Sequence, residues 1–162
     1  MRARWAWLGA GAAALALASS CGSKCGPSSA MVTSVVDGDT IVLEGGQKVR
    51  YLLADAPETT AGKNDCYGAQ ATDFNRATVE GKTVQLTYDE AECTDRYGRL
   101  LAYVKAGGVE VNSALVQQGM ACVLYIAPGG QARREEFLTY EAEAKTARTG
   151  MWGACTAIPC SL

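Results

Sequence analysis

The sequence predicts an α+β protein, mainly β, in which five short strands form a small barrel with helical additions. Short runs rich in Val, Ile, Leu and Tyr are separated by turn residues, which is typical of strands. One helical segment interrupts these strands and two more follow them, and no repeat or internal linker divides the 162 residues. A chain of this length suits one domain with a real core.

Each predicted element has a local signal. Gly45-Gly46 predicts a two-residue hairpin turn between the second and third strands. Gly81 and Gly119 end the first two helices. The expected strands are Met31–Val36, Thr40–Glu44, Gln47–Ala54, Lys82–Asp89 and Leu100–Ala106. The expected helices are Tyr67–Val79, Val111–Gln118 and Gly130–Arg148.

Residues 1–20, MRARWAWLGAGAAALALASS, predict a signal peptide. Arg2 and Arg4 precede an apolar run that is short for a membrane span. Cys21 follows small residues as in the lipobox of bacterial lipoproteins, so we expect a lipid on Cys21, with ordinary signal cleavage after Ser20 as the alternative. The expected product is exported to the cell envelope, membrane-anchored or otherwise secreted or periplasmic.

After the signal peptide we expect a flexible tether at 21–30, one domain at 31–153 and a cysteine-containing tail at 154–162. The chain has seven cysteines, and a lipid on Cys21 would leave six, enough for three disulfides in an oxidising compartment. An even number of cysteines does not determine which of them pair, because six cysteines allow about fifteen connectivities.

Composition restricts the chemistry. The chain has no histidine, which excludes Ser-His-Asp and Cys-His nucleophile systems and most zinc sites. Any hydrolysis must therefore use carboxylates, Arg, Tyr and a hard metal bound through oxygen. The net charge is −2, and the part after residue 20 has 13 basic and 17 acidic side chains. Because polyanion binding usually rests on many Lys and Arg contacts, a nucleic-acid ligand would depend on local charge.

Four acids flank the second and third strands: Asp37, Asp39, Asp55 and Glu58. A two-residue turn would place Ile41 opposite Arg50 and Asp39 opposite Leu52, so that Asp39 and Arg50 become diagonal neighbours. Asp55 and Glu58 leave the end of the same hairpin on the side where Asp39 enters it. The sequence thus gathers carboxylates and one guanidinium in one neighbourhood. The alternative is that the acids are solvated turn residues and Arg50 a simple ion-pair partner.

Five stretches resemble the staphylococcal nuclease (thermonuclease) family in order and approximate spacing: VVDGDT, VRYLLADAPET, CYGAQA, DRYGRLLAYV and VNSALVQQGMACVLY. The resemblance covers about residues 31–153. It implies an oligonucleotide-binding (OB) barrel of five strands with three helices. It also implies calcium-dependent hydrolysis of DNA and RNA phosphodiesters to products with 3′-phosphates.

The resemblance also implies roles for single residues. The residues expected to hold Ca²⁺ are Asp39, Asp55 and, through its backbone carbonyl, Ala56. The expected catalytic residues are Glu58, which would activate the attacking water, and the phosphate-binding pair Arg50 and Arg99. The expected nucleic-acid contacts are Arg96 and Tyr97 at a terminal phosphate and Tyr125 beside a base.

Two features depart from the family. Ala127 stands where members often carry a second Tyr, so we expect weaker base stacking. The cysteines are an addition: Cys66 opens the first helix and Cys93 lies just before DRYGR. We predict a Cys66–Cys93 disulfide that ties the loops of Glu58 and Arg99 together, and leave the other four cysteines unassigned.

Two other functions stay open. One is a non-catalytic OB module that binds nucleic acid or protein, and the other is a structural envelope lipoprotein with inert acids. The complete set of acids and arginines favours the enzyme. DNA, RNA or both are the expected substrates, no motif indicates a protein partner, and we expect a monomer.

Overall fold

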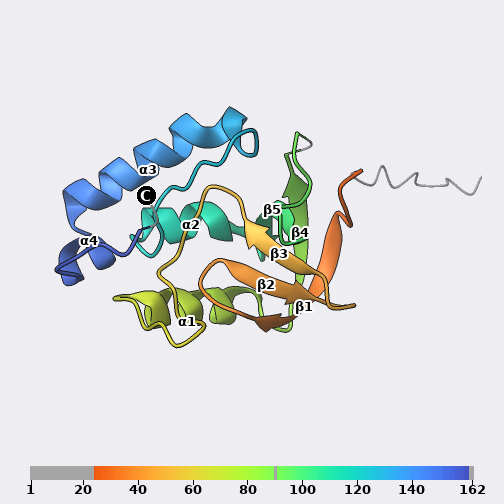
Figure 1. Ribbon diagram of the computed structural model, residues 1–162, viewed down its shortest axis with the longest axis horizontal. Coiled ribbons are helices and arrows are strands. Elements are labelled where there is room, and N and C mark those ends of the chain that lie inside the picture. Colours follow the sequence, from red (N-terminus) through yellow and green to blue (C-terminus); the bar gives the residue numbers. More distant parts are fainter. Residues whose placement is uncertain (1–23, 90, 161–162) are drawn as a thin grey trace, which may run out of the picture.

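The computed structural model describes residues 24–89 and 91–160. Its barrel strands are β1 (Ser29–Val35), β2 (Thr40–Leu43), β3 (Lys48–Tyr51), β4 (Thr83–Tyr88) and β5 (Leu100–Ala106). They are paired in the order β3-β2-β1-β4-β5, and a parallel pairing of β3 with β5 closes the ring (Figure 1). A short strand β6 (Val109–Glu110) extends the sheet beyond β5. The predicted five-stranded OB-type barrel is confirmed.

The β2–β3 hairpin has a different register from the predicted one. Ile41 pairs with Val49 rather than with Arg50. The reason lies in the turn, because the last N–H of β2 donates to the carbonyl of Gln47 and leaves a three-residue loop, 44–46. Both glycines of this loop have positive φ angles, 91° and 86°. A Gly-Gly pair permits either loop length, and the predicted two-residue turn was wrong.

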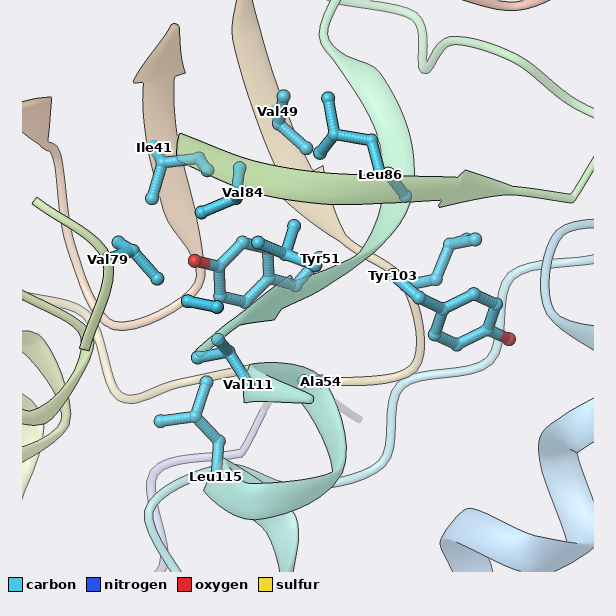
Figure 2. Close-up of a cluster of buried hydrophobic side chains, with 14 of the residues drawn as sticks. Ile41, Val49, Tyr51, Ala54, Val79, Val84, Leu86, Tyr103, Val111 and Leu115 are labelled. Carbon is cyan, nitrogen blue, oxygen red and sulfur yellow. The ribbon is translucent and has the colours of Figure 1, made fainter. Parts of the chain in front are cut away.

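The barrel core is packed with aliphatic side chains around Tyr51 (Figure 2). Strand β4 alternates exposed and buried residues along its length, as a strand with one face in a core should. The buried hydroxyl of Tyr51 donates to Asn75 Oδ1 at 2.7 Å, and Asn75 Nδ2 donates to the carbonyl of Asp37 at 2.9 Å. The core therefore fixes the turn between β1 and β2, which carries Asp37 and Asp39.

Three main helices accompany the barrel, as predicted. They are α1 (Gly68–Val79), α2 (Val111–Gln117) and α3 (Arg134–Ala147), and the structure adds a 3₁₀ turn η1 (Gln131–Arg133) and a one-turn helix α4 (Met151–Ala154). Helix α2 lies between the barrel and α3 (Figure 1). Its buried Asn112 accepts the N–H of Val104 and donates to the carbonyls of Leu52 and Ala102, which fixes α2 to β5 and to the segment after β3. No helix in the described ranges combines the length and apolar character that a bilayer crossing requires.

The disulfides differ from the prediction. The six cysteines of the described residues pair as Cys25–Cys93, Cys66–Cys155 and Cys122–Cys160. The predicted Cys66–Cys93 bridge is therefore wrong. Each loop cysteine instead meets a cysteine from a chain end, because both terminal segments fold back onto the barrel. Cys21 and the expected signal peptide, residues 1–20, lie outside the described residues.

The segment that precedes the barrel is attached to it. Cys25 is bonded to Cys93, the hydroxyl of Tyr88 donates to the carbonyl of Pro27 at 2.8 Å, and β1 already begins at Ser29. Residues 24–30 of the expected tether are thus attached to the barrel, while 21–23 lie outside the described part of the chain.

Candidate active site

A pocket of about 670 Å³ lies beside β3, between the β1–β2 turn, the segment after β3, the loop before β5 and the C-terminal segment. It brings together the residues predicted to bind metal, to catalyse or to contact nucleic acid, except Tyr125. Cys66 and Cys93 do not line it, and Cys21 lies outside the described residues. Seven acidic and four basic side chains line it: Asp37, Asp39, Asp55, Glu58, Asp65, Glu92 and Asp95, with Arg50, Lys63, Arg96 and Arg99. This excess of carboxylates favours the binding of a cation.

Asp39 is held in the β1–β2 turn, where it is 5% exposed. Its N–H donates to Asp37 Oδ1 at 3.1 Å, and its Oδ2 accepts the N–H of Ala56 at 2.7 Å. The glycine of the DGD sequence permits this contact, because a Cβ on Gly38 would lie 2.5 Å from the Cβ of Ala56. Burial raises the pKa of Asp39 to about 6, against the opposing effect of Arg50. The carboxylate is therefore short of positive charge.

Arg50, on β3, joins the two acids that flank the hairpin. Its Nε lies 3.1 Å from Asp39 Oδ1 and its Nη2 lies 2.7 Å from Asp55 Oδ1. Its Nη1 donates to the carbonyl of Tyr51 at 2.8 Å and also to that of Ala54. The predicted proximity of Asp39 and Arg50 thus holds although the predicted strand register does not, because Asp39 precedes β2 and its side chain is not bound to the face alternation of the strand.

The donor set at this point consists of oxygen atoms. Asp39 and Asp55 supply carboxylates, and the backbone of Ala56 lies beside them. No group of three or more His, Cys, Asp or Glu side chains in residues 24–89 and 91–160 is arranged as a metal-binding set. Two carboxylates with backbone oxygens and water nevertheless fit Ca²⁺, which accepts irregular oxygen coordination. The raised pKa of the buried Asp39 fits a site completed by a cation.

Glu58 lies in the loop after β3 and is held in its ionised form. Its Oε1 accepts three hydrogen bonds, from Thr59 N–H at 3.0 Å, Thr60 N–H at 2.8 Å and the Thr60 hydroxyl at 2.6 Å. The hydrogen bonds from Thr60 are the main reason that the pKa of Glu58 is lowered. Asp65 fixes the loop, because its carboxylate accepts the N–H of Glu58 at 3.2 Å and its own N–H donates to the Glu58 carbonyl at 3.0 Å.

Arg99 closes the turn that precedes β5. Its Nη2 lies 2.7 Å from Asp95 Oδ2, while Asp95 Oδ1 accepts the N–H groups of Tyr97 and Arg99 at 2.9 and 3.0 Å. The side chain of Arg99 is 27% exposed. Tyr97 is 68% exposed, and the guanidinium carbon of Arg96 lies 4.8 Å from its ring centre. This turn therefore presents two arginines and an aromatic face to the pocket.

Tyr125 does not line the pocket, although its neighbours Leu124 and Ile126 do. Its hydroxyl donates to Gln131 Oε1, and the guanidinium carbon of Arg134 lies 5.2 Å from its ring centre. Ile126 is 65% exposed and occupies the pocket edge that the sequence assigned to Tyr125. Tyr125 thus packs toward the start of α3.

Sequence reasoning missed the residues that hold the catalytic candidates in place. Thr60 and Asp65 hold Glu58, and Asp95 holds Arg99. The signal for Asp95 lies in the DRYGR stretch itself, which begins with this acid. A Thr two residues after an acid was also visible, and such residues often bond locally in turns. Nothing in the sequence placed Pro159 of the tail in the pocket wall.

The fold and the pocket define an α+β protein with an OB-type barrel and an acid- and arginine-lined site. The family profile described as "Staphylococcal nuclease homologue" matches residues 48–154. The "Thermonuclease" of Staphylococcus hyicus is 32% identical over 126 residues, which cover 75% of this chain and 73% of that protein. The chain belongs to the staphylococcal nuclease homologue family, and the resemblance seen in the sequence is confirmed.

Other relatives carry similar names. An "Uncharacterized endonuclease" of Escherichia coli O157:H7 is 35% identical over 133 residues, 79% of each chain. "Endonuclease YncB" of Bacillus subtilis (strain 168) is 40% identical over 123 residues, which are 72% of this chain and 58% of that protein. The match thus spans less than two thirds of YncB.

Proposed function

We propose that this protein is a calcium-dependent nuclease that hydrolyses phosphodiester bonds of DNA, RNA or both and leaves 3′-phosphate ends. The observation that carries the proposal is the convergence of one buried and one partly buried aspartate, one ionised glutamate and two arginines on one pocket: Asp39, Asp55, Glu58, Arg50 and Arg99. Relatives named endonuclease and thermonuclease support it.

Glu58 is the proposed general base. Only its Oε1 takes part in the hydrogen bonds found among the described residues, so Oε2 can accept a proton from the attacking water. Its lowered pKa keeps it ionised, which is the form that a general base needs. The hydrogen bonds from Thr60 also fix the orientation of the carboxylate before substrate binds.

Arg99 and Arg50 are the proposed phosphate ligands. Charge grows on the phosphate oxygens as water adds to phosphorus, and a guanidinium placed beforehand stabilises this charge by roughly 3 kcal/mol. Asp95 engages the Nε and Nη2 of Arg99, which leaves the Nη1 group of this side chain to donate to the phosphate. Arg50 is more fully engaged by Asp39, Asp55 and two carbonyls. Arg99 is therefore the more available of the two.

Asp39, Asp55 and the carbonyl of Ala56 would hold the Ca²⁺. A bound calcium ion would neutralise part of the negative charge of the pocket and of the phosphate. This matters because acids outnumber bases around the pocket, so a polyanion meets net repulsion there. Arg96 and Tyr97 would contact a terminal phosphate, and the exposed Tyr97 and Ile126 offer surfaces for bases.

The test compares cleavage of single-stranded DNA in four reactions: wild type with calcium, wild type with EDTA, and Glu58→Ser and Arg99→Ala with calcium. Cleavage in the first reaction, with large losses in the other three, supports the proposal. Arg76→Ala is the matched control, because Arg76 is an exposed residue of α1 that pairs only locally with Asp73 and Glu80. Equal cleavage in all reactions, or DNA binding in calcium without cleavage, would reject it, and the latter would support a non-catalytic binding module.

We extend the proposal to export, with a lipid on Cys21. The disulfides of the described residues support it, because disulfides persist in oxidising compartments outside the cytosol. The apolar run before Cys21 supports a cleaved leader. Intact mass of the protein purified from membranes tests both: a chain that starts at Cys21 and carries acyl mass supports the anchor. A soluble chain of unmodified mass would reject the lipid.

A further inference from the structure

The C-terminal segment forms part of the pocket wall. Helix α4 ends at Ala154, and residues 155–160 form no helix or strand, yet Pro159 lines the pocket. Disulfides hold this segment at both ends, to partners 89 and 38 residues away in the sequence. The segment is thus fixed across the pocket edge by covalent bonds to two separate parts of the domain.

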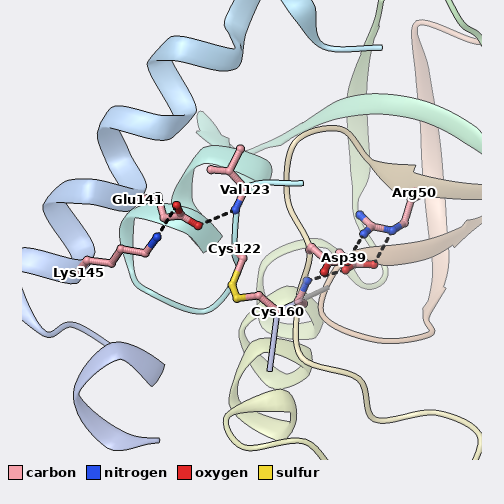
Figure 3. The surroundings of a disulfide bond; sticks show 9 residues. Asp39, Arg50, Cys122, Val123, Glu141, Lys145 and Cys160 are labelled. Atoms are coloured by element: carbon pink, nitrogen blue, oxygen red, sulfur yellow. Dashed lines mark hydrogen bonds and ion pairs between the residues drawn. A yellow bond between two sulfur atoms is a disulfide. The ribbon is translucent and has the colours of Figure 1, made fainter. Parts of the chain in front are cut away.

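One of these bonds joins the backbone neighbour of a site acid. Cys122 and Asp55 exchange backbone hydrogen bonds, each N–H donating to the carbonyl of the other at 2.9 Å. Cys122 is 4% exposed, and the N–H of the next residue, Val123, donates to Glu141 of α3 at 3.0 Å (Figure 3). The disulfide to Cys160 therefore ends on a segment that lies between α3 and Asp55.

The other bond ends beside the glutamate loop. Cys66 directly follows Asp65, whose carboxylate and N–H hold the backbone of Glu58. Cys66 is bonded to Cys155. Both ends of the C-terminal segment are therefore attached next to residues that support the site.

We infer that the C-terminal segment 155–160, held by Cys66–Cys155 and Cys122–Cys160, is a positioning element of the active site. It fixes the backbone of Asp55 through Cys122 and closes the pocket wall with Pro159. The inference rests on the proposed function in assigning Asp55 to calcium. Groups that orient metal ligands without touching the metal change metal affinity by about 10- to 100-fold when they are removed.

The test is a double variant, Cys122→Ala/Cys160→Ala, compared with Cys25→Ala/Cys93→Ala. The control bridge closes a longer stretch of chain, 68 residues against 38, so its loss reduces general stability at least as much in the chain-entropy description. Its ends lie at the N-terminal segment and before the DRYGR turn, not beside Asp55. The readouts are hydrogen exchange at the Asp55 amide, with the amides of β4 as reference, and the calcium Kd.

Loss of Cys122–Cys160 should speed exchange at the Asp55 amide by about tenfold or more relative to β4 and weaken calcium binding by about tenfold, and the control should change neither. Wild-type exchange at Asp55 in the Cys122/Cys160 variant, or equal acceleration in the control, would overturn the inference. If the double variant does not fold, the single variant Cys160→Ala replaces it. This variant also lacks the disulfide but keeps the buried Cys122, and the same hydrogen-exchange rate of the Asp55 amide is measured. If the wild type neither binds calcium nor cleaves DNA, the proposed function is rejected. The hydrogen-exchange rate of the Asp55 amide then still tests whether the C-terminal segment positions Asp55.

Discussion

The guanidinium of Arg50 lies 3.1 Å from the carboxylate of Asp39 and 2.7 Å from that of Asp55, so one cation serves two acids. Both partners of the Asp39 pair are largely buried, with side chains 12% and 7% exposed. Burial still raises the pKa of Asp39 to about 6. Arg50 alone therefore does not balance the charge of this corner of the pocket, and a further cation would.

Arg50→Met should destabilise the fold as well as stop cleavage. Removal of one partner of a buried ion pair leaves the other charge uncompensated, with an expected loss of about 3 kcal/mol in the free energy of unfolding. Urea unfolding at neutral pH measures it. The double variant Arg50→Met/Asp39→Asn should lose less than the sum of the single variants, because one of the two carboxylates that lose Arg50 is then neutral. A loss below about 0.5 kcal/mol in Arg50→Met would show that the pair is not buried as described.

Gly38→Ala should disturb the contact between the Asp39 turn and Ala56. The new Cβ would lie 2.5 Å from the Cβ of Ala56 and 2.8 Å from that of Ala71. Overpacking of this kind destabilises by about 1–3 kcal/mol. Thermal melts should show the loss, and adding Ala56→Gly should recover part of it because one of the clashing atoms is removed. An unchanged melting temperature in Gly38→Ala would contradict the close packing of this turn.

Thr60→Val should lower kcat about tenfold with little change in KM, because the lost hydrogen bond orients the carboxylate of Glu58 rather than the substrate. Thr60→Ser keeps the hydroxyl and should retain most of the activity. Steady-state kinetics with a single-stranded oligonucleotide separate the two parameters. Equal kcat in the Val and Ser variants would show that the hydroxyl has no positioning role.

Glu136→Gln should lower stability at neutral pH but not in acid. Hydrogen bonds from Arg133 hold the pKa of Glu136 below its usual value of 4.5, against the opposing effect of burial. The folded state thus favours ionised Glu136. Ionised Glu136 therefore stabilises the fold fully above pH 4.5, and this stabilisation is lost as the pH falls through the lower pKa of the folded state. The melting-temperature difference between wild type and variant should therefore shrink from pH 7 to about pH 3. Glu135→Gln, an exposed neighbour, should show little difference at either pH, and a constant difference for Glu136→Gln would contradict the assignment.

The barrel could be predicted because short runs rich in Val, Ile, Leu and Tyr are separated by turn residues, and because the order of strands and helices restricts the fold. Strand β4 also alternates exposed and buried residues. The register of the β2–β3 hairpin could not, since two adjacent glycines allow a loop of two or three residues. The predicted proximity of Asp39 and Arg50 was correct although the predicted register was wrong, because Asp39 lies just outside β2.

The disulfides could not be predicted because pairing depends on where the chain ends pack. Cys66 and Cys93 lie near functional loops in the sequence, yet each meets a cysteine of a terminal segment. The residues that hold the catalytic candidates by hydrogen bonds are equally hard to predict. In the sequence Thr60 and Asp95 are ordinary loop residues, and only the folded loops bring them close to Glu58 and Arg99. The position of Tyr125 outside the pocket depends on a loop conformation that sequence spacing does not determine.

Calcium titration of the full chain tests the central claim most directly. The account predicts binding that is at least about tenfold weaker in Asp39→Asn and in Asp55→Asn than in wild type. Asp73→Asn, on the exposed face of α1, should bind as wild type does. Calcium affinity that is the same in all four proteins, or no binding by the wild type, would contradict a cation site at these two acids.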